Sequence, residues 1–302
     1  MPSTYAHYRF GQEVRRMLSE RDRKIVEEHL DLFLIGLHGP DILFYYKPLH
    51  PNPVNQIGYG MHAHPAKEFF LYATRIVEQQ KELQKERQKE QQTEQQNGQH
   101  NEKRTDDGYV DYQASLAYLY GFICHFALDV SCHGYIDEKI SQSGVTHAEI
   151  EVEFDRALLI QDGFDPIRKR LTDHITITPE YASVISKFFP GVNSIQVEKA
   201  LHSMVFYNNL LIAPSKVKRG LVHSLLKVSG NYHEMHGLLV NYDKNPACED
   251  SNQRLQQLYL DGEKLAIMLI NEYRAYRHGA VNLNEIYCYT FGSQLIEREV
   301  VA

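Results

Sequence analysis

The sequence contains no tryptophan and only four cysteines among its 302 residues, although it has 16 histidines and 20 tyrosines. No two cysteines form a Cys-x-x-Cys pair. The sparse cysteines indicate reduced thiols rather than a disulfide framework, and they also speak against a structural zinc site built from thiolates. The enrichment in histidine, rather than cysteine, is the main compositional clue to function.

The chain also lacks a positive net charge and a long apolar run. Its formal net charge is −7 at pH 7, whereas nucleic-acid binding usually requires a basic surface. No apolar run is long enough to cross a bilayer, and residues 1–7 have neither the basic nor the apolar part of a secretory signal. We therefore expect a cytoplasmic protein with no transmembrane segment and no nucleic-acid partner. Nothing in the sequence indicates its oligomeric state.

Helical periodicity dominates and convincing strands are few, so we expect an all-α fold that forms a single domain over residues 1–302. Residues 78–108 are an exception, because 17 of the 20 residues from 78 to 97 are Glu, Gln, Lys or Arg. We interpret them as a charged low-complexity insertion, either a solvated helix or a disordered segment, without chemistry. Residues 192–302 form a C-terminal helical half, with helices expected over 194–212, 215–229, 253–277 and 282–297.

The strongest functional signal is a stripe of three polar residues in an otherwise apolar segment. His125, Asp129 and His133 follow one another at intervals of four, inside a helix expected from about Tyr112 to Tyr135. Each step of four turns the side chain by about 40°, so the three share one face. Buried charges must be paired or bound to a metal. A bound metal ion would satisfy all three side chains.

Further candidate ligands lie on both sides of this stripe. His147 and Glu151 are again four apart, in a helix that we expect to be capped by Thr146 with Glu149 at its third position. Alone, such a pair is more simply a surface hydrogen bond.

Asp41 follows Gly39-Pro40, which should end a buried apolar helix, and alone it is more simply a helix cap. His62 and His64 lie in a segment, 47–66, that we expect to be a Pro- and Gly-rich loop, and the sequence does not decide between them. His7 lies among aromatic residues near the start of the chain.

Imidazole and carboxylate ligands suit zinc, iron or manganese, and more than four of them indicate two or three ions. Other helical metal enzymes can be excluded by motif. No histidine has a glutamate three residues before it, as di-iron bundles require, and there is no His-Glu-x-x-His and no His-Asp dipeptide.

The pattern resembles the zinc-dependent phospholipase C family, which is related to the S1/P1 nucleases. The resemblance lies in the Gly39-Pro40-Asp41 corner, the downstream His62/His64 pair, the His125-x3-Asp129-x3-His133 stripe, the His147-x3-Glu151 pair and the start of the chain from Ser3 to His7. It covers about residues 1–165 and implies a multi-helix bundle like that of phospholipase C and P1 nuclease.

The resemblance also implies how the ligands are shared. Asp41, His125 and Asp129, with His62 or His64, would hold one zinc ion. His133, His147 and Glu151 would hold a second. Asp129 would bridge to a third ion bound by His7. Secreted members complete that third site with an N-terminal tryptophan, which this chain does not have.

The function implied by the resemblance is phosphodiester hydrolysis of phospholipase C type. Zinc would lower the pKa of a bound water, and the resulting hydroxide would attack phosphorus. Asp41 would also serve as general base. The substrate would be a phospholipid or a small phosphodiester, and we expect transient contact with a membrane surface. Two alternatives stay open: a helical protein that binds metal with weak or no catalysis, and a nuclease-like phosphodiesterase, which the acidic charge disfavours.

Overall fold

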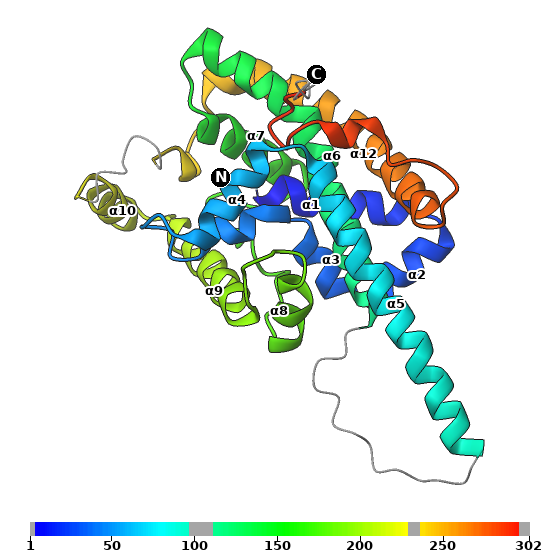
Figure 1. Cartoon of the computed structure of the whole chain (residues 1–302). Coiled ribbons are helices and arrows are strands. Elements are labelled where there is room, and N and C mark those ends of the chain that lie inside the picture. The colour runs from blue at the N-terminus through cyan, green and yellow to red at the C-terminus, as the bar shows by residue number, and fades with distance from the viewer. Residues whose placement is uncertain (1–3, 97–110, 229–235, 296–302) are drawn as a thin grey trace, which may run out of the picture.

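The structure is a computed structural model that describes residues 4–96, 111–228 and 236–295. Within these residues the chain is helical, and the only β-type pairing is one isolated bridge between Tyr289 and Leu295. The all-α prediction is confirmed. The helices shown in Figure 1 are α1 (Thr4–Met17), α2 (Glu20–Glu28), α3 (Leu30–Gly36), α4 (Pro53–Ala63), α5 (Ala66–Gln96), α6 (Tyr112–Ser143), α7 (His147–Gln161), α8 (Pro179–Ser186), α9 (Ser194–Leu211), α10 (Lys216–Val228) and α12 (Glu249–Arg277). Four short 3₁₀ helices join them: η1 (Gly39–Tyr45), η2 (His236–Leu238), η3 (Pro246–Cys248) and η4 (Glu285–Cys288).

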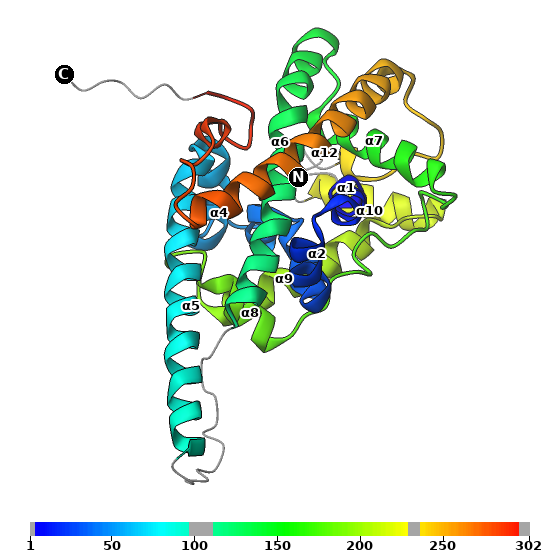
Figure 2. The same cartoon turned by 90° about the vertical axis from the view of Figure 1, so that its right-hand side faces the viewer.

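Helix α6 runs through the middle of the molecule, and α1, α3, α5 and α12 all contact it (Figures 1 and 2). The expectation that no apolar run is long enough to cross a bilayer is wrong, because α6 alone among the described helices is long and apolar enough by length and composition. However, 89% of its apolar window is buried inside the protein. Its apolar side chains therefore form the centre of the protein core, and any polar group among them must find a partner there.

Two glycines bring α3 very close to α6. A Cβ atom on Gly121 would lie 2.1 Å from the carbonyl oxygen of Phe33, and one on Gly36 would lie 2.2 Å from that of Tyr118. Both positions therefore require glycine. The close approach carries the chain that follows α3, which includes Asp41, directly onto the polar stripe of α6.

Helix α1 is held at its start by a carboxylate from α7. Both oxygens of the buried Asp155 accept hydrogen bonds, at 3.0 Å from the backbone nitrogen of Tyr5 and at 2.7 Å from that of Ala6. These are donors that the first turn of a helix leaves without intrahelical partners. Helix α7 itself begins with the predicted capping box of Thr146 and Glu149, which is confirmed.

Two predicted element boundaries are wrong. Residues 47–66 were expected to be a loop, but Pro53–Ala63 form α4, which begins with a capping box between Asn52 and Asn55. Proline is well tolerated in the first helical turn, where its missing N–H is not needed. The helix expected to end near Tyr135 continues to Ser143 and stops at Gly144, which has a φ of 68°.

The insertion and the C-terminus differ from the prediction in part. Residues 78–96 continue α5 as a helix that extends well beyond the rest of the molecule (Figure 1), and the remainder of the predicted insertion, 97–108, lies outside the described residues. A helix over 282–297 is wrong for the described part, which contains only η4 and the isolated bridge. This C-terminal segment instead packs against α6 beside the polar stripe, through Phe291 and Ser293.

Candidate metal centre

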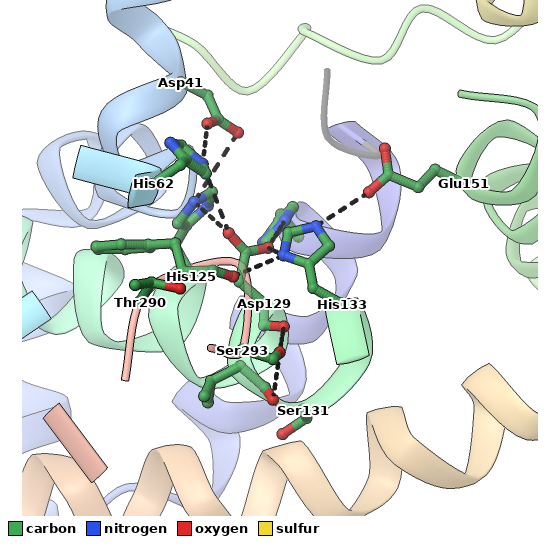
Figure 3. A network of polar contacts seen from close by, with 12 residues as sticks. Asp41, His62, His125, Asp129, Ser131, His133, Glu151, Thr290 and Ser293 are labelled. Carbon is green, nitrogen blue, oxygen red and sulfur yellow. Dashed lines mark hydrogen bonds and ion pairs between the residues drawn. The ribbon is translucent and has the colours of Figure 1, made fainter. Parts of the chain in front are cut away.

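The predicted stripe on α6 is present and buried. His125, Asp129 and His133 are 0%, 3% and 7% exposed and follow each other along the helix (Figure 3). Asp129 lies between the two histidines. Its Oδ2 is 3.0 Å from His125 Nε2, and its Oδ1 is 4.0 Å from His133 Nδ1. A carboxylate so enclosed by imidazoles is the common element of the site.

On one side, Asp41 and His62 join His125. His62 Nε2 lies 3.2 Å from Asp41 Oδ1, and His125 Nε2 lies 3.9 Å from Asp41 Oδ2. Asp41 is placed by η1, in which Gly39 has a φ of 48° and a Cβ atom would lie 2.3 Å from the His125 ring. The chain can turn this tightly over the imidazole only because residue 39 is glycine.

Behind this group, His7 contacts the other oxygen of Asp129. His7 Nε2 lies 3.2 Å from Asp129 Oδ1, and its ring stacks on that of His125 with centroids 4.3 Å apart.

The third group is on the far side of Asp129. There Glu151 Oε1 lies 3.4 Å from His133 Nε2 and 2.9 Å from His147 Nε2. Residues of both groups, His7, Asp129, His133 and Glu151, line one cavity.

Three backbone carbonyls set the orientation of the histidines. His125 Nδ1 donates to the Leu37 carbonyl at 3.1 Å, His62 Nδ1 to Gly58 at 3.0 Å, and His133 Nδ1 to Phe291 at 2.6 Å. A proton held on Nδ1 leaves the Nε2 lone pair of a neutral imidazole facing the site, which is the usual arrangement around a metal. No sequence pattern indicates these carbonyls, because every residue type has one.

The charges of the site are strongly linked. Burial tends to lower the pKa of His133, but Asp129 and Glu151 outweigh it and raise that pKa to about 10. For Asp129, burial tends to raise the pKa, but His125 and His133 hold it well below its usual range. Burial also tends to raise the pKa of Glu151, but His147 and His133 outweigh it and lower that pKa. Asp129 and Glu151 are therefore both ionised at neutral pH. Negative charge therefore lies at the middle of the cluster, on Asp129, and at its far end, on Glu151.

A second observation, the lack of hydrogen bonds at several buried donor atoms, also indicates that this set would fit metal ions. Six of its buried atoms have no hydrogen bond of acceptable geometry: both oxygens of Asp41, Oδ2 of Asp129, Oε2 of Glu151, Nε2 of His125 and Nδ1 of His7. His125 Nε2 and Asp129 Oδ2 are only 3.0 Å apart, yet they are not aligned as donor and acceptor. Buried polar atoms left in this state are costly, and atoms that converge without bonding to one another are what a shared cation requires.

The structure brings together eight of the predicted site residues in three groups, and in each group the ligand atoms lie within 4.8 Å of one another. The groups are His7, His125 and Asp129; Asp41, His62 and His125; and His133, His147 and Glu151. His64 is not among them, because it follows the last turn of α4 and is exposed. His147 and His62 are the most accessible members, with side chains 39% and 23% exposed.

Comparison with known proteins places this site in a family. A family model described as zinc dependent phospholipase C matches residues 6–194, which is more than half of the chain and includes all three groups. Searches of curated proteins and of solved structures found no match. The ligand-like groups, the all-α fold and the family match agree, and the chain belongs to the zinc dependent phospholipase C family.

Proposed function

We propose that this protein hydrolyses a phosphodiester bond of a phospholipid or of a small phosphodiester, using zinc ions held by the three groups. The observation that carries the proposal is the set of converging, unbonded ligand atoms around Asp129, inside the segment that matches the family. Asp41, His62, His125 and Asp129 would hold one ion, and His133, His147 and Glu151 a second. His7 and Asp129 would form part of a third site. Bound zinc would supply a Lewis acid for the phosphoryl oxygens and lower the pKa of a coordinated water.

Within this chain, Asp41 is the residue best placed to accept a proton from an attacking water. Its side chain is buried, faces His62 and His125, and is not hydrogen-bonded in the described structure. The oxygen that leaves phosphorus takes a proton in turn, so the reaction consumes one water and yields an alcohol and a phosphomonoester. Because His62 and His147 are the exposed members, substrate would reach the site past one of these two side chains.

The test combines metal analysis with hydrolysis of a chromogenic phosphodiester by the purified protein, before and after chelation. We expect at least two zinc ions per chain, turnover that is lost on chelation, and recovery on adding zinc. Less than one zinc ion per chain would refute the proposal. Bound zinc without turnover would favour a helical metal-binding protein that lacks catalysis.

A variant of the central carboxylate, Asp129, tests the proposal within the protein, and a variant of an exposed carboxylate serves as its control. Asp129→Ala should lose zinc and reduce turnover by more than about a hundredfold, because even residues that only support a ligand change metal affinity by about 10- to 100-fold. Asp137→Ala changes an exposed carboxylate two turns further along the same helix, and it should keep both zinc and activity. Full activity in Asp129→Ala would contradict the assigned role.

A further inference from the structure

His7 differs from three other histidines of the candidate metal centre in what orients its ring. His125, His62 and His133 each donate from Nδ1 to a backbone carbonyl. His7 Nδ1 is buried and has no hydrogen bond within the described part of the chain. The direction of its Nε2, which lies 3.2 Å from Asp129 Oδ1, is therefore set by the position of helix α1 and by the stack on the His125 ring.

The position of α1 is fixed at its first turn by Asp155 of α7. Asp155 is 3% exposed, and its oxygens accept hydrogen bonds from the backbone nitrogens of Ala6 at 2.7 Å and of Tyr5 at 3.0 Å. The first turn of α1 has no acidic residue of its own. The carboxylate from α7 therefore satisfies two N–H groups that lack intrahelical partners, and it balances the positive end of the helix dipole. Both N–H groups lie within two residues of His7.

A second carboxylate, Asp162 at the end of α7, holds the next part of α1. Its Oδ2 accepts from Tyr5 Oη at 2.5 Å and from Arg9 Nε at 2.8 Å. Tyr5 and Arg9 lie two residues before and two residues after His7, so α7 restrains the chain on both sides of this imidazole. The side chain of Asp162 is 27% exposed, and water can replace its contacts. Asp155 is buried, and its contacts cannot be replaced in this way.

Helix α7 carries Asp155 in line with two candidate ligands. His147, Glu151 and Asp155 follow one another at intervals of four, so they share one face of the helix. His147 and Glu151 belong to the third ligand group, whereas Asp155 belongs to none of the three groups. One helix therefore places two ligands directly and, through Asp155, the start of the helix that carries His7.

We propose that Asp155 is a positioning residue that places His7 for metal binding without contacting an ion itself. This inference rests on the proposed binding of zinc by the group of His7, His125 and Asp129. Without Asp155, the first turn of α1 loses two hydrogen bonds, and His7 has no hydrogen bond at Nδ1 that would keep Nε2 directed at Asp129. Zinc at this group is then held more weakly.

The test is a double-mutant cycle on the zinc affinity of the full-length chain, measured by competition with a chromogenic chelator. Asp155→Ala should weaken zinc binding by at least about tenfold, as residues that only support a ligand do. Asp155→Asn has nearly the same shape and keeps one acceptor oxygen, so it should weaken binding less. In a chain that already carries His7→Ala, Asp155→Ala should change zinc affinity by less than about twofold, because two changes that act through one ligand are not additive.

Cobalt in place of zinc supplies a readout that a loss of stability alone does not move. The visible absorption of bound Co²⁺ depends on its ligands and their geometry, so His7→Ala and Asp155→Ala should change the spectrum in the same way. The matched control is Glu153→Gln. Glu153 is also buried on α7, at 1% exposure, but it accepts from Asn241 Nδ2 and the Asn245 backbone nitrogen rather than from α1. This variant should keep the wild-type zinc affinity and cobalt spectrum.

The positioning role and catalysis are separable in the same set of proteins. The predicted loss of zinc affinity in a protein that does not hydrolyse a chromogenic phosphodiester would refute the proposed function and leave the role of Asp155 intact. Equal effects of Asp155→Ala with and without His7→Ala, or zinc affinity that either single substitution leaves unchanged, would overturn the inference even in an active enzyme. If Asp155→Ala does not fold, Asp155→Asn takes its place in the cycle and is judged by the same outcomes.

Discussion

His62 and His64 are two residues apart, yet only His62 faces the candidate metal centre. His62 is in the last turn of α4, where the Gly58 carbonyl accepts its Nδ1 proton, and its Nε2 lies 3.2 Å from Asp41. His64 is the residue after that helix, with extended φ and ψ of −118° and 155°. Choosing between them requires knowing where α4 ends. The sequence analysis expected residues 47–66 to be a loop, so it predicted no helix end there.

We predict that His62→Ala lowers both zinc content and turnover, whereas His64→Ala changes neither. The first removes an Nε2 lone pair that faces Asp41, and we expect a loss of activity of at least about tenfold. The second removes an exposed ring. Zinc per chain and the rate on a soluble phosphodiester check both variants. Equal effects of the two substitutions would contradict the orientation of α4.

At the scale of elements, sequence reasoning worked best where one helix carries the whole signal. The stripe of His125, Asp129 and His133 needs only helical periodicity, and the structure places its three members on one buried face of α6. The link between His133 and the Phe291 carbonyl, 158 residues apart, is different. It depends on how an irregular segment packs, and no local pattern encodes that.

The close approach of α3 and α6 gives a prediction for stability. Gly121→Ala should lower the free energy of unfolding by about 1–3 kcal/mol, because its Cβ atom would lie 2.1 Å from the Phe33 carbonyl and push the helices apart. Thermal unfolding of the purified variant measures this.

A control lies on the same helix. The Cβ atom of Gly134→Ala would meet only Ser293 Cβ at 3.6 Å, an ordinary contact. We therefore expect a gain of about 0.5–1 kcal/mol, since alanine favours the helix over glycine. If Gly121→Ala proved as stable as Gly134→Ala, the close packing of α3 on α6 would be wrong.

The contact between α1 and α12 predicts a pH dependence of stability. Burial, together with the neighbouring carboxylate of Glu13, raises the pKa of Glu263 from 4.5 to about 7. The folded state then holds the proton more tightly than the unfolded state does. Its stability therefore falls as pH rises from about 4.5 through 7, and the full cost is present above pH 7.

Glu263→Gln should therefore raise the free energy of unfolding by about 1 kcal/mol at pH 8, a value reduced for solvent screening of a partly exposed group, and by almost nothing at pH 4. Denaturant unfolding at the two pH values measures the difference. Glu90→Gln, which changes an exposed carboxylate on α5, should give no such dependence. A Glu263→Gln variant with the same effect at both pH values would rule out the raised pKa.

At the scale of the whole molecule, the candidate metal centre joins segments that are far apart in the sequence. Its ligands come from α1, η1, α4, α6 and α7, and the Phe291 carbonyl that orients His133 comes from beyond residue 194, outside the family match. The ligand types could be predicted because imidazoles and carboxylates have recognisable spacings. The supporting carbonyls could not be predicted, because they arise only once these segments pack together.

Because so many segments meet at the centre, removing zinc should destabilise the whole fold rather than one loop. A metal that binds only the folded state stabilises it by about 4 kcal/mol at a thousandfold excess over its Kd, so chelation should lower Tm by more than about 5 °C. Without the ions, Asp129 and Glu151 keep only imidazoles to balance their buried charge. Scanning calorimetry with and without a chelator measures the shift, and zinc added back should restore it. In Asp129→Ala the chelator should have a much smaller effect, and an unchanged Tm in the wild-type protein would show that zinc does not hold these segments together.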